Sequence, residues 1–311
     1  MKKSEITYLS ADGLTTIHAT LWLPEGEPRA VLQIAHGMQE YIGRYEPFAV
    51  YLTEHGFAVA GNDHLGHGRS VTSEDKLGYF ARKNGNACVL KDMHTLREHM
   101  QALYPDLPYF VMGHSMGSFL MRQYIESHGE GLSGAVIMGT GTQPAATLAL
   151  GKLICRLIAA FRGWEYRSSL VENIAFGSYN KRIHPQKTKH DWITKDEAVV
   201  KKYESDPWCM FQFTVNGFYN MFLSIQRCQK EENVRRIPRD LPVLFASGAE
   251  DPVGNYGKGV KAAYEQCLKC GLRNVKIRLY ENDRHEILNE TDKKTVWQDL
   301  LSWLENCRTK A

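Results

Sequence analysis

Short apolar runs alternate with amphipathic stretches along most of the chain. Runs rich in apolar residues predict strands at residues 30–35, 57–63, 109–114, 134–139, 241–248 and 275–280. Longer stretches predict helices at residues 44–55, 86–103, 118–128, 258–270 and 292–306. Residues 4–10 and 15–23 alternate in character around Asp12-Gly13, which predicts a hairpin at the sheet edge. Together these patterns indicate an α/β fold, with a mostly parallel central sheet and helices on both faces.

The alternation of strands and helices stops in the middle of the chain. Residues 142–235 contain no comparable strand pattern, and we interpret them as helices joined by loops. We therefore expect a core formed by residues 1–141 and 236–311, with residues 142–235 inserted as a helical cap.

Composition narrows the class of protein. Of the 311 residues, 43% are hydrophobic and 23% are charged, which is typical of a globular protein with a full core. A net charge of +3 gives no reason to expect nucleic acid as a partner. Neither a membrane span nor a signal peptide is expected from the apolar runs. Seven cysteines at scattered spacings predict reduced thiols and a cytoplasmic protein, while oligomeric state is not indicated.

The strand at 109–114 runs into the sequence Gly113-His114-Ser115-Met116-Gly117, and a helix is expected to follow. This is the G-x-S-x-G nucleophile elbow, in which a serine occupies a sharp strand-to-helix turn. The glycines avoid clashes where the strand and the helix pass closely, and the turn holds the serine hydroxyl clear of the sheet. Ser115 is therefore the predicted nucleophile.

A serine at neutral pH needs a base, and the base needs an orienting acid. With an elbow of this kind the order along the chain is serine, acid, histidine. His285 is the one histidine beyond residue 251, and it follows a predicted strand. Glu250 and Asp251 both qualify as the acid after the strand at 241–248. Pro252 restricts the backbone of Asp251, and we favour Asp251.

The tetrahedral intermediate of acyl transfer needs two hydrogen-bond donors for its oxyanion. The N–H of Met116 follows the nucleophile directly. The loop after the strand at 30–35 should supply the second donor, from the N–H of Met38, and Gly37 lets this loop approach the site closely.

Several motifs together resemble the monoacylglycerol lipase and lysophospholipase-like group of α/β hydrolases, in particular its bacterial members. They are His36-Gly37, Gly43-Arg44-Tyr45-Glu46, the Asp63–Ser70 segment, the elbow at 113–117, Asp251 and His285. The resemblance spans nearly the whole chain, although the insertion matches only in position and helical character. It implies the α/β-hydrolase fold and a serine esterase that needs no cofactor and acts on monoacyl lipids or similar esters.

The resemblance also implies positions for the alcohol part of the substrate. Glu40 and Arg44 fall where monoglyceride lipases place polar groups around the glycerol head. These lipases also have a second histidine three residues beyond the catalytic one, where this chain has Leu288. This difference puts in question whether a monoglyceride is the substrate, and it does not affect the predicted ester hydrolysis.

Two apolar stripes in the insertion are candidates for contact with an acyl chain. Residues 150–161 place Leu153 and Leu157 on one helical face, and residues 208–223 carry a stripe that includes Phe211 and Phe218. Packing within the protein is the favoured interpretation of both. The alternative for the first stripe is a lid helix that shields an acyl chain or makes transient contact with a membrane surface.

We find no metal or cofactor site in the sequence. His64 and His67 lie in a glycine-rich turn without a cluster that would complete a metal shell, so a structural role is favoured. The predicted function is hydrolysis of small or single-chain carboxylic esters through an acyl-enzyme on Ser115. A proline-releasing aminopeptidase remains an alternative, with Glu172, Glu197 or Glu204 holding the substrate amine. A ligand receptor that keeps the hydrolase fold is another.

Overall fold

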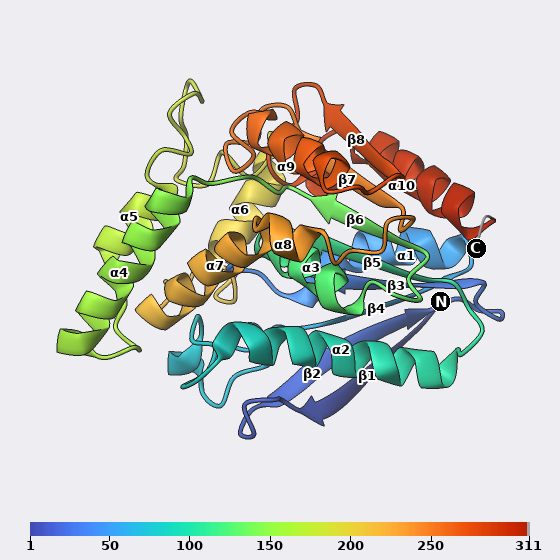
Figure 1. Ribbon diagram of the computed structural model, residues 1–311, viewed down its shortest axis with the longest axis horizontal. Coiled ribbons are helices and arrows are strands. Elements are labelled where there is room, and N and C mark those ends of the chain that lie inside the picture. The colour runs from blue at the N-terminus through green and yellow to red at the C-terminus, as the bar shows by residue number, and fades with distance from the viewer. Residues whose placement is uncertain (310–311) are drawn as a thin grey trace.

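The computed structural model describes residues 1–309, which are built around one eight-stranded sheet (Figure 1). The strands are β1 (Lys2–Leu9), β2 (Thr16–Leu23), β3 (Ala30–Ala35), β4 (Phe57–Asn62), β5 (Tyr109–His114), β6 (Gly134–Met138), β7 (Val243–Gly248) and β8 (Val275–Tyr280). Their order across the sheet is β1-β2-β4-β3-β5-β6-β7-β8. The β1–β2 hairpin pairs antiparallel at one edge, β2 also pairs antiparallel with β4, and β3 to β8 are parallel.

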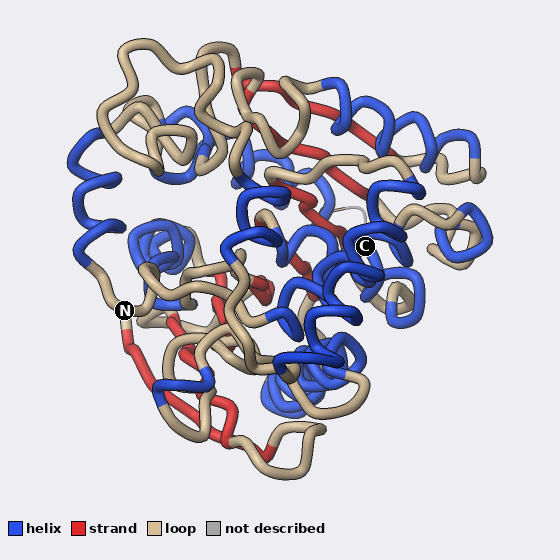
Figure 2. Tube along the Cα trace, turned by 90° about the vertical axis from the view of Figure 1, so that its left-hand side faces the viewer, coloured by secondary structure: helices blue, strands red, loops and turns tan. Residues whose placement is uncertain are grey.

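Helices cover both faces of the sheet, and the strands run between them as one twisted band (Figure 2). Helices α1 (Glu46–Glu54) and α10 (Lys293–Arg308) pack on one face, and α2 (Gly85–Leu103), α3 (Met116–His128) and α9 (Lys258–Lys269) pack on the other. Residues of β5 alternate between the two cores. Phe110 and Met112 join the core under α1 and α10, whereas Tyr109 and Val111 join the opposite one. This burial on both sides explains why the central strands consist of nearly continuous apolar residues.

Short 3₁₀ helices and a helical segment complete the chain. The short helices are η1 (Ile42–Tyr45), η2 (Glu74–Lys76) and η3 (Ile287–Asn289). Between β6 and β7 the chain forms α4 (Ala145–Arg162), α5 (Ser169–Phe176), α6 (Glu197–Ser205), α7 (Val215–Cys228) and α8 (Glu231–Val234). Helices α4 and α5 project from one end of the molecule, at the left of Figure 1.

Buried side-chain contacts tie this helical segment to the loop that precedes α2. Thr214, the N-cap of α7, donates its hydroxyl to the Gly78 carbonyl at 2.7 Å. Asn216 donates to the Ala81 carbonyl at 2.9 Å. Within residues 1–309, no helix combines the length and the hydropathy that crossing a bilayer requires.

The structure confirms the predicted fold class, including the edge hairpin and the mostly parallel sheet. The predicted helix ends fall within one or two residues of the observed ends for α9 and α10. Alternation of apolar strands and amphipathic helices was thus sufficient to establish the layered architecture.

Candidate functional site

The turn between β5 and α3 holds Ser115 in a strained backbone conformation, with φ 53° and ψ −119°. Only a glycine-flanked turn fits this position. A Cβ on Gly113 would lie 2.2 Å from the Gly117 carbonyl oxygen, and a Cβ on Gly117 would lie 2.1 Å from the Ala35 oxygen. Both contacts are far too close for a side chain, so β3, β5 and α3 pack backbone against backbone here. Strain of this kind is maintained by the surrounding structure and is common at active sites.

The loops after β7 and β8 bring an acid and a histidine together at the carboxyl ends of the parallel strands. His285 Nδ1 lies 2.9 Å from Asp251 Oδ2. Asp251 is fully buried and also accepts hydrogen bonds from the Ser247 hydroxyl at 3.2 Å and the Val253 N–H at 2.8 Å. Three donors therefore fix the orientation of this carboxylate. Glu250, the other candidate acid, is exposed.

Two backbone N–H groups lie in the loops that flank Ser115. Met38 is in the loop after β3, and Met116 is the first residue of α3. In the part of the chain that the structure describes, neither N–H donates a hydrogen bond to another residue. Gly37 lets the Met38 loop come close, because a Cβ at residue 37 would lie 3.0 Å from the Ser115 Cβ. Both N–H groups are free to bind an oxyanion.

These groups share one cavity of about 470 Å³. Ser115, His285, Met38 and Met116 all line it, so the structure brings these four predicted residues together. Apolar side chains form much of the remaining wall, and they come from α3, α4, α5 and α7: Phe119, Leu148, Phe176, Met221, Phe222 and Ile225. A cavity of this size with a small group of polar atoms at one end fits a ligand with an apolar chain.

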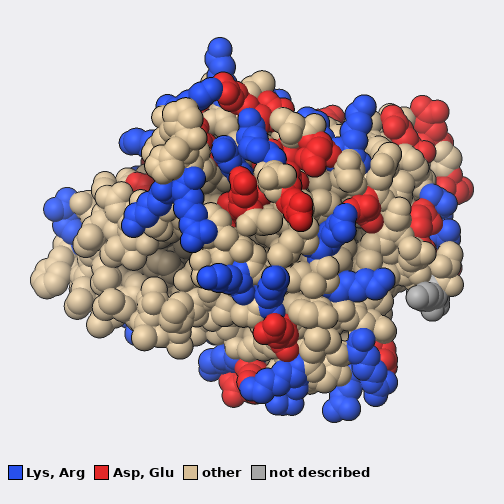
Figure 3. All heavy atoms as spheres, turned by 90° about the horizontal axis from the view of Figure 1, so that it is seen from above, with Lys and Arg blue, Asp and Glu red and all other residues tan. Residues whose placement is uncertain are grey.

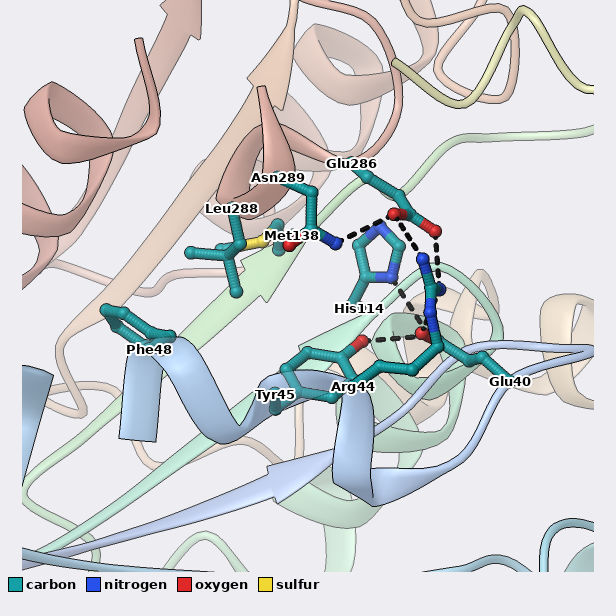
Figure 4. A pocket seen from close by; sticks show the side chains of 9 residues that line it. All are labelled: Glu40, Arg44, Tyr45, Phe48, His114, Met138, Glu286, Leu288 and Asn289. Carbon is teal, nitrogen blue, oxygen red and sulfur yellow. Dashed lines mark hydrogen bonds and ion pairs between the residues drawn. The ribbon is translucent and has the colours of Figure 1, made fainter. Parts of the chain in front are cut away.

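A buried ion network lies next to the cavity (Figure 4). Arg44 forms two parallel hydrogen bonds with Glu286, at 2.7 and 2.8 Å, and a third with Glu40 at 2.9 Å. Asn289 donates to Glu286 at 2.8 Å. The predicted alcohol-binding residues therefore differ in position. Glu40 lines the cavity, whereas Arg44 lies in a separate small pocket with its guanidinium engaged by the two carboxylates.

The charges of this network are mutually stabilising. Although burial opposes ionisation, hydrogen bonding to His114 and the charge of Arg44 hold the pKa of Glu40 far below its ordinary value. Burial alone would lower the pKa of His114, but its hydrogen bond to Glu40 outweighs that effect and raises the pKa. The network therefore contains ionised Glu40 and Arg44, with a histidine beside them that favours its protonated form.

The predicted acyl-chain residues of the insertion do not line the cavity. Leu153 and Leu157 are 51% and 53% exposed. The opposite face of α4, with Leu148 and Gly151, packs inward, because the missing side chain of Gly151 lets α4 approach the Phe222 ring to within contact distance. The expectation that Leu153 and Leu157 pack within the protein is therefore wrong, and neither side chain lines the cavity.

The aromatic stripe of residues 208–223 is mainly core. Phe218 is fully buried, with its ring centroid 5.7 Å from that of Phe213 and 6.2 Å from that of Phe222. Phe211 lines a neighbouring groove, and Phe222 is the member of the stripe that lines the cavity. Phe222 belongs to the same helically spaced stripe in the sequence, but the pattern alone did not identify which member of the stripe faces the cavity.

The histidines of the Asp63–Ser70 turn belong to the protein interior. His64 and His67 are fully buried, and burial lowers the pKa of both well below the ordinary value. His67 lies among aromatic rings, 5.2 Å from Phe213 between centroids. In residues 1–309, no group of three or more His, Cys, Asp or Glu side chains has an arrangement that could hold a metal ion.

The chain is similar to a known family and to several proteins of known structure or activity. The family model Hydrolase_4, described as serine aminopeptidase S33, matches residues 26–292. A carboxyl esterase from Bacillus coagulans, solved in complex with glycerol, is 32% identical, with 99% of each chain covered and a TM-score of 0.91. A monoacylglycerol lipase from Mycolicibacterium smegmatis is 24% identical over 317 residues, 97% of each chain. A monoglyceride lipase variant from Saccharomyces cerevisiae has a TM-score of 0.77 at 20% identity, covering 99% of this chain and 97% of its own, and shares the fold.

Proposed function

The chain belongs to the Hydrolase_4 family of α/β hydrolases, and from this premise we propose that it hydrolyses carboxylic esters of monoacyl lipids or similar small esters through an acyl-enzyme on Ser115. The observation that carries the proposal is the hydrogen-bonded pair of Asp251 and His285, which opens onto the same cavity as Ser115. The relatives named monoacylglycerol lipase and carboxyl esterase support an ester as substrate.

The proposed mechanism follows from the arrangement of the loops. Asp251 accepts the Nδ1 proton of His285, which leaves Nε2 as the base that takes the Ser115 hydroxyl proton during attack on the ester carbonyl. The N–H groups of Met38 and Met116 stabilise the oxyanion. Nε2 then donates its proton to the leaving alcohol, and the acyl group remains on Ser115. A water molecule, activated by the same histidine, releases the fatty acid and restores the enzyme.

The cavity wall supports an acyl chain as the occupant of the apolar end. Phe119, Leu148 and Phe222 line it, and exclusion of water from this end favours acyl transfer in a low-dielectric site. We propose that residues 142–235 form a cap, since α4, α5 and α7 contribute much of this wall.

The aminopeptidase alternative has less support. Glu197 pairs with Lys187, and Glu204 pairs with His190. The carboxylates that do line the cavity, Glu40 and Glu286, are engaged by Arg44. A free amine would have to share these carboxylates with that guanidinium.

A second part of the proposal concerns the exposed face of the cap. The side chains that share this face are large, apolar and exposed: Leu150 at 58%, Leu153 at 51%, Leu157 at 53% and Phe161 at 87%. The end of the molecule that carries α4 and α5 shows few charges and is hollowed (Figure 3). Such a face favours transient contact with a membrane surface, from which a monoacyl lipid can enter the cavity.

The six buried cysteines are free thiols, which supports a reducing compartment such as the cytoplasm.

Membrane contact is tested with phosphatidylcholine vesicles. The double variant Leu153→Ser/Leu157→Ser should sediment less with vesicles and show a higher KM for vesicle-borne monoacylglycerol, with unchanged turnover of a water-soluble short-chain ester. Leu14→Ser is the matched control, because Leu14 is 79% exposed in the turn between β1 and β2. Equal sedimentation of the double variant and the wild type would contradict membrane contact through α4.

The central test of the function is Ser115→Ala. We expect this variant to fold normally and to lose hydrolysis of a p-nitrophenyl ester almost completely, because it lacks the hydroxyl that carries the acyl group in the proposed mechanism. Ser133→Ala, in the loop before β6, is the control and should keep wild-type turnover. Wild-type rates in Ser115→Ala would overturn the assignment, and a wild-type protein that neither turns over esters nor reacts with a fluorophosphonate would favour a receptor.

A further inference from the structure

Arg44 does not line the cavity that contains Ser115, and its guanidinium is engaged by other side chains. Its guanidinium forms a bidentate pair with Glu286 and bonds to Glu40, and it stacks over the Tyr203 ring with 5.0 Å to the ring centroid. The Arg44 side chain is 12% exposed, and those of Glu40 and Glu286 are 5% and 6% exposed. A planar fork that meets a carboxylate edge to edge is the most directional ion pair available to a protein.

The network contacts the segments that form the proposed active site. Glu40 accepts hydrogen bonds from the Gly37 N–H, from the Tyr45 hydroxyl at 2.8 Å, and from His114 Nδ1 at 3.3 Å. Gly37 directly precedes the oxyanion donor of the β3 loop, and His114 directly precedes the nucleophile. His114 Nε2 also lies 3.3 Å from the backbone oxygen of His285. Figure 4 shows how these side chains converge on the two carboxylates.

Glu286 is the link to the proposed base, because it follows His285 directly in the chain. Its backbone N–H donates to the Ile193 carbonyl at 2.7 Å, and its side chain is held by Arg44 and Asn289. The loop that carries the histidine is therefore fixed from two sides. One anchor is the cap, and the other is the arginine of η1.

We propose that Arg44 and Glu286 are positioning residues, which hold the oxyanion loop and the histidine loop in register and do not bind the substrate alcohol. This inference rests on the proposed ester hydrolysis at Ser115. Breaking the pair leaves each loop free to shift relative to the nucleophile. Misplacement by about 1 Å from a change outside the reacting groups can reduce the rate about 10²-fold.

The positioning role differs from alcohol binding in what it predicts for two esters of the same fatty acid. If the pair positions the loops, its loss lowers kcat equally for a monoacylglycerol and for the corresponding ethyl ester. If the pair binds glycerol, its loss affects the monoacylglycerol alone. The ratio of kcat/KM for the two esters therefore separates the two roles, independently of the absolute rate.

The variants are Glu286→Gln, which keeps the shape and loses the charge, and Arg44→Lys, which keeps the charge and loses the fork. Both retain a polar partner for the buried groups, so folding is preserved better than with an apolar replacement. We expect kcat to fall about 10- to 100-fold for both esters, with KM within about twofold of the wild type. Asp92→Asn is the control, because Asp92 is a buried carboxylate that accepts from Ser10 and Ala11, away from the cavity.

The outcomes separate this inference from the function on which it rests. Three results would overturn the positioning role. They are a loss of kcat/KM on the monoacylglycerol alone, an unchanged kcat on both esters, and a loss of activity no larger than that of an equally destabilised Asp92→Asn. The positioning role is supported if kcat falls equally for both esters while the thermal unfolding midpoint of the variant matches that of the Asp92→Asn control. If the wild type itself shows no ester turnover and no fluorophosphonate labelling of Ser115, the proposed function fails instead.

Discussion

Replacement of Asp251 by asparagine tests the proposed role of the acid through the tautomer of His285. The Oδ1 atom of Asp251 accepts from the Val253 N–H at 2.8 Å, so the amide oxygen of an asparagine will occupy that side. Its NH₂ group then faces His285 Nδ1, where the carboxylate oxygen now lies at 2.9 Å. Nδ1 must accept a hydrogen bond, and the ring proton moves to Nε2. In that tautomer the imidazole cannot take the proton of Ser115.

The expected loss is large because one defined step is blocked. In a serine hydrolase with a Ser-His-Asp triad, the change from aspartate to asparagine lowers kcat about 10⁴-fold. This loss corresponds to about 5.4 kcal/mol of transition-state stabilisation. The fold should tolerate the change, since the Ser247 hydroxyl, 3.2 Å from Oδ2, can accept from the new NH₂ group. Steady-state hydrolysis of a p-nitrophenyl ester at pH 7 to 8 measures kcat, and thermal unfolding checks the fold.

Glu250→Gln is the matched control for this measurement. Glu250 is adjacent in the chain, carries the same charge and is exposed, so its replacement should leave kcat within about twofold of the wild type. Two results would refute the reasoning from the tautomer. One is that Asp251→Asn keeps more than a tenth of the wild-type kcat, and the other is that Glu250→Gln loses as much kcat as Asp251→Asn.

Two further predictions concern stability and pH. Burial lowers the pKa of His67 well below 6.5, so the unfolded state takes up a proton below about pH 6.5 that the folded state does not, and stability falls as the pH falls. His67→Phe should reduce this slope in urea titrations between pH 7.5 and 5, by up to about 1.4 kcal/mol per pH unit at the acid end of that range, and an unchanged slope would count against it. Burial raises the pKa of Glu126 to about 8, so the folded state keeps a proton that the unfolded state loses, and stability falls as the pH rises above about 4.5. Glu126→Gln should therefore be more stable than the wild type at pH 9, on the order of 1 kcal/mol, with no gain near pH 4.5; equal stabilities at pH 9 would contradict this account.

The fold was predictable because each element carries its own local signal. The parallel strands are buried on both faces, so they appear as apolar runs in sequence, and their helices carry one apolar stripe. The elbow is a local signal of the same kind, whereas Asp251 and His285 were predicted from the chain order that accompanies such an elbow and from their places after strands. The family relationship implied by these motifs is confirmed.

The direction in which α4 faces could not be predicted from its own sequence. Its leucines form the stronger apolar stripe, yet the side with Gly151 packs on Phe222 because the glycine permits closer helix contact. Which face of an amphipathic helix turns inward depends on the surface against which it packs, and the helix's own sequence does not contain that information.

The pair of Arg44 and Glu286 was also beyond sequence reasoning. The two residues lie 242 positions apart, and no local spacing links them. The one available signal was an acid directly after the proposed base. Its meaning depends on burial, because an arginine in the interior requires carboxylate partners whereas one at the surface does not.

The acyl-enzyme itself provides the most direct test of the central claim. Wild-type protein is mixed with a p-nitrophenyl ester of a medium-chain fatty acid, quenched in acid within the first turnovers, and digested for mass spectrometry. The account predicts that the peptide containing Ser115 gains the mass of the acyl group, and that this species disappears once substrate is exhausted. Rapid ester turnover with the acyl group on a different residue would contradict it.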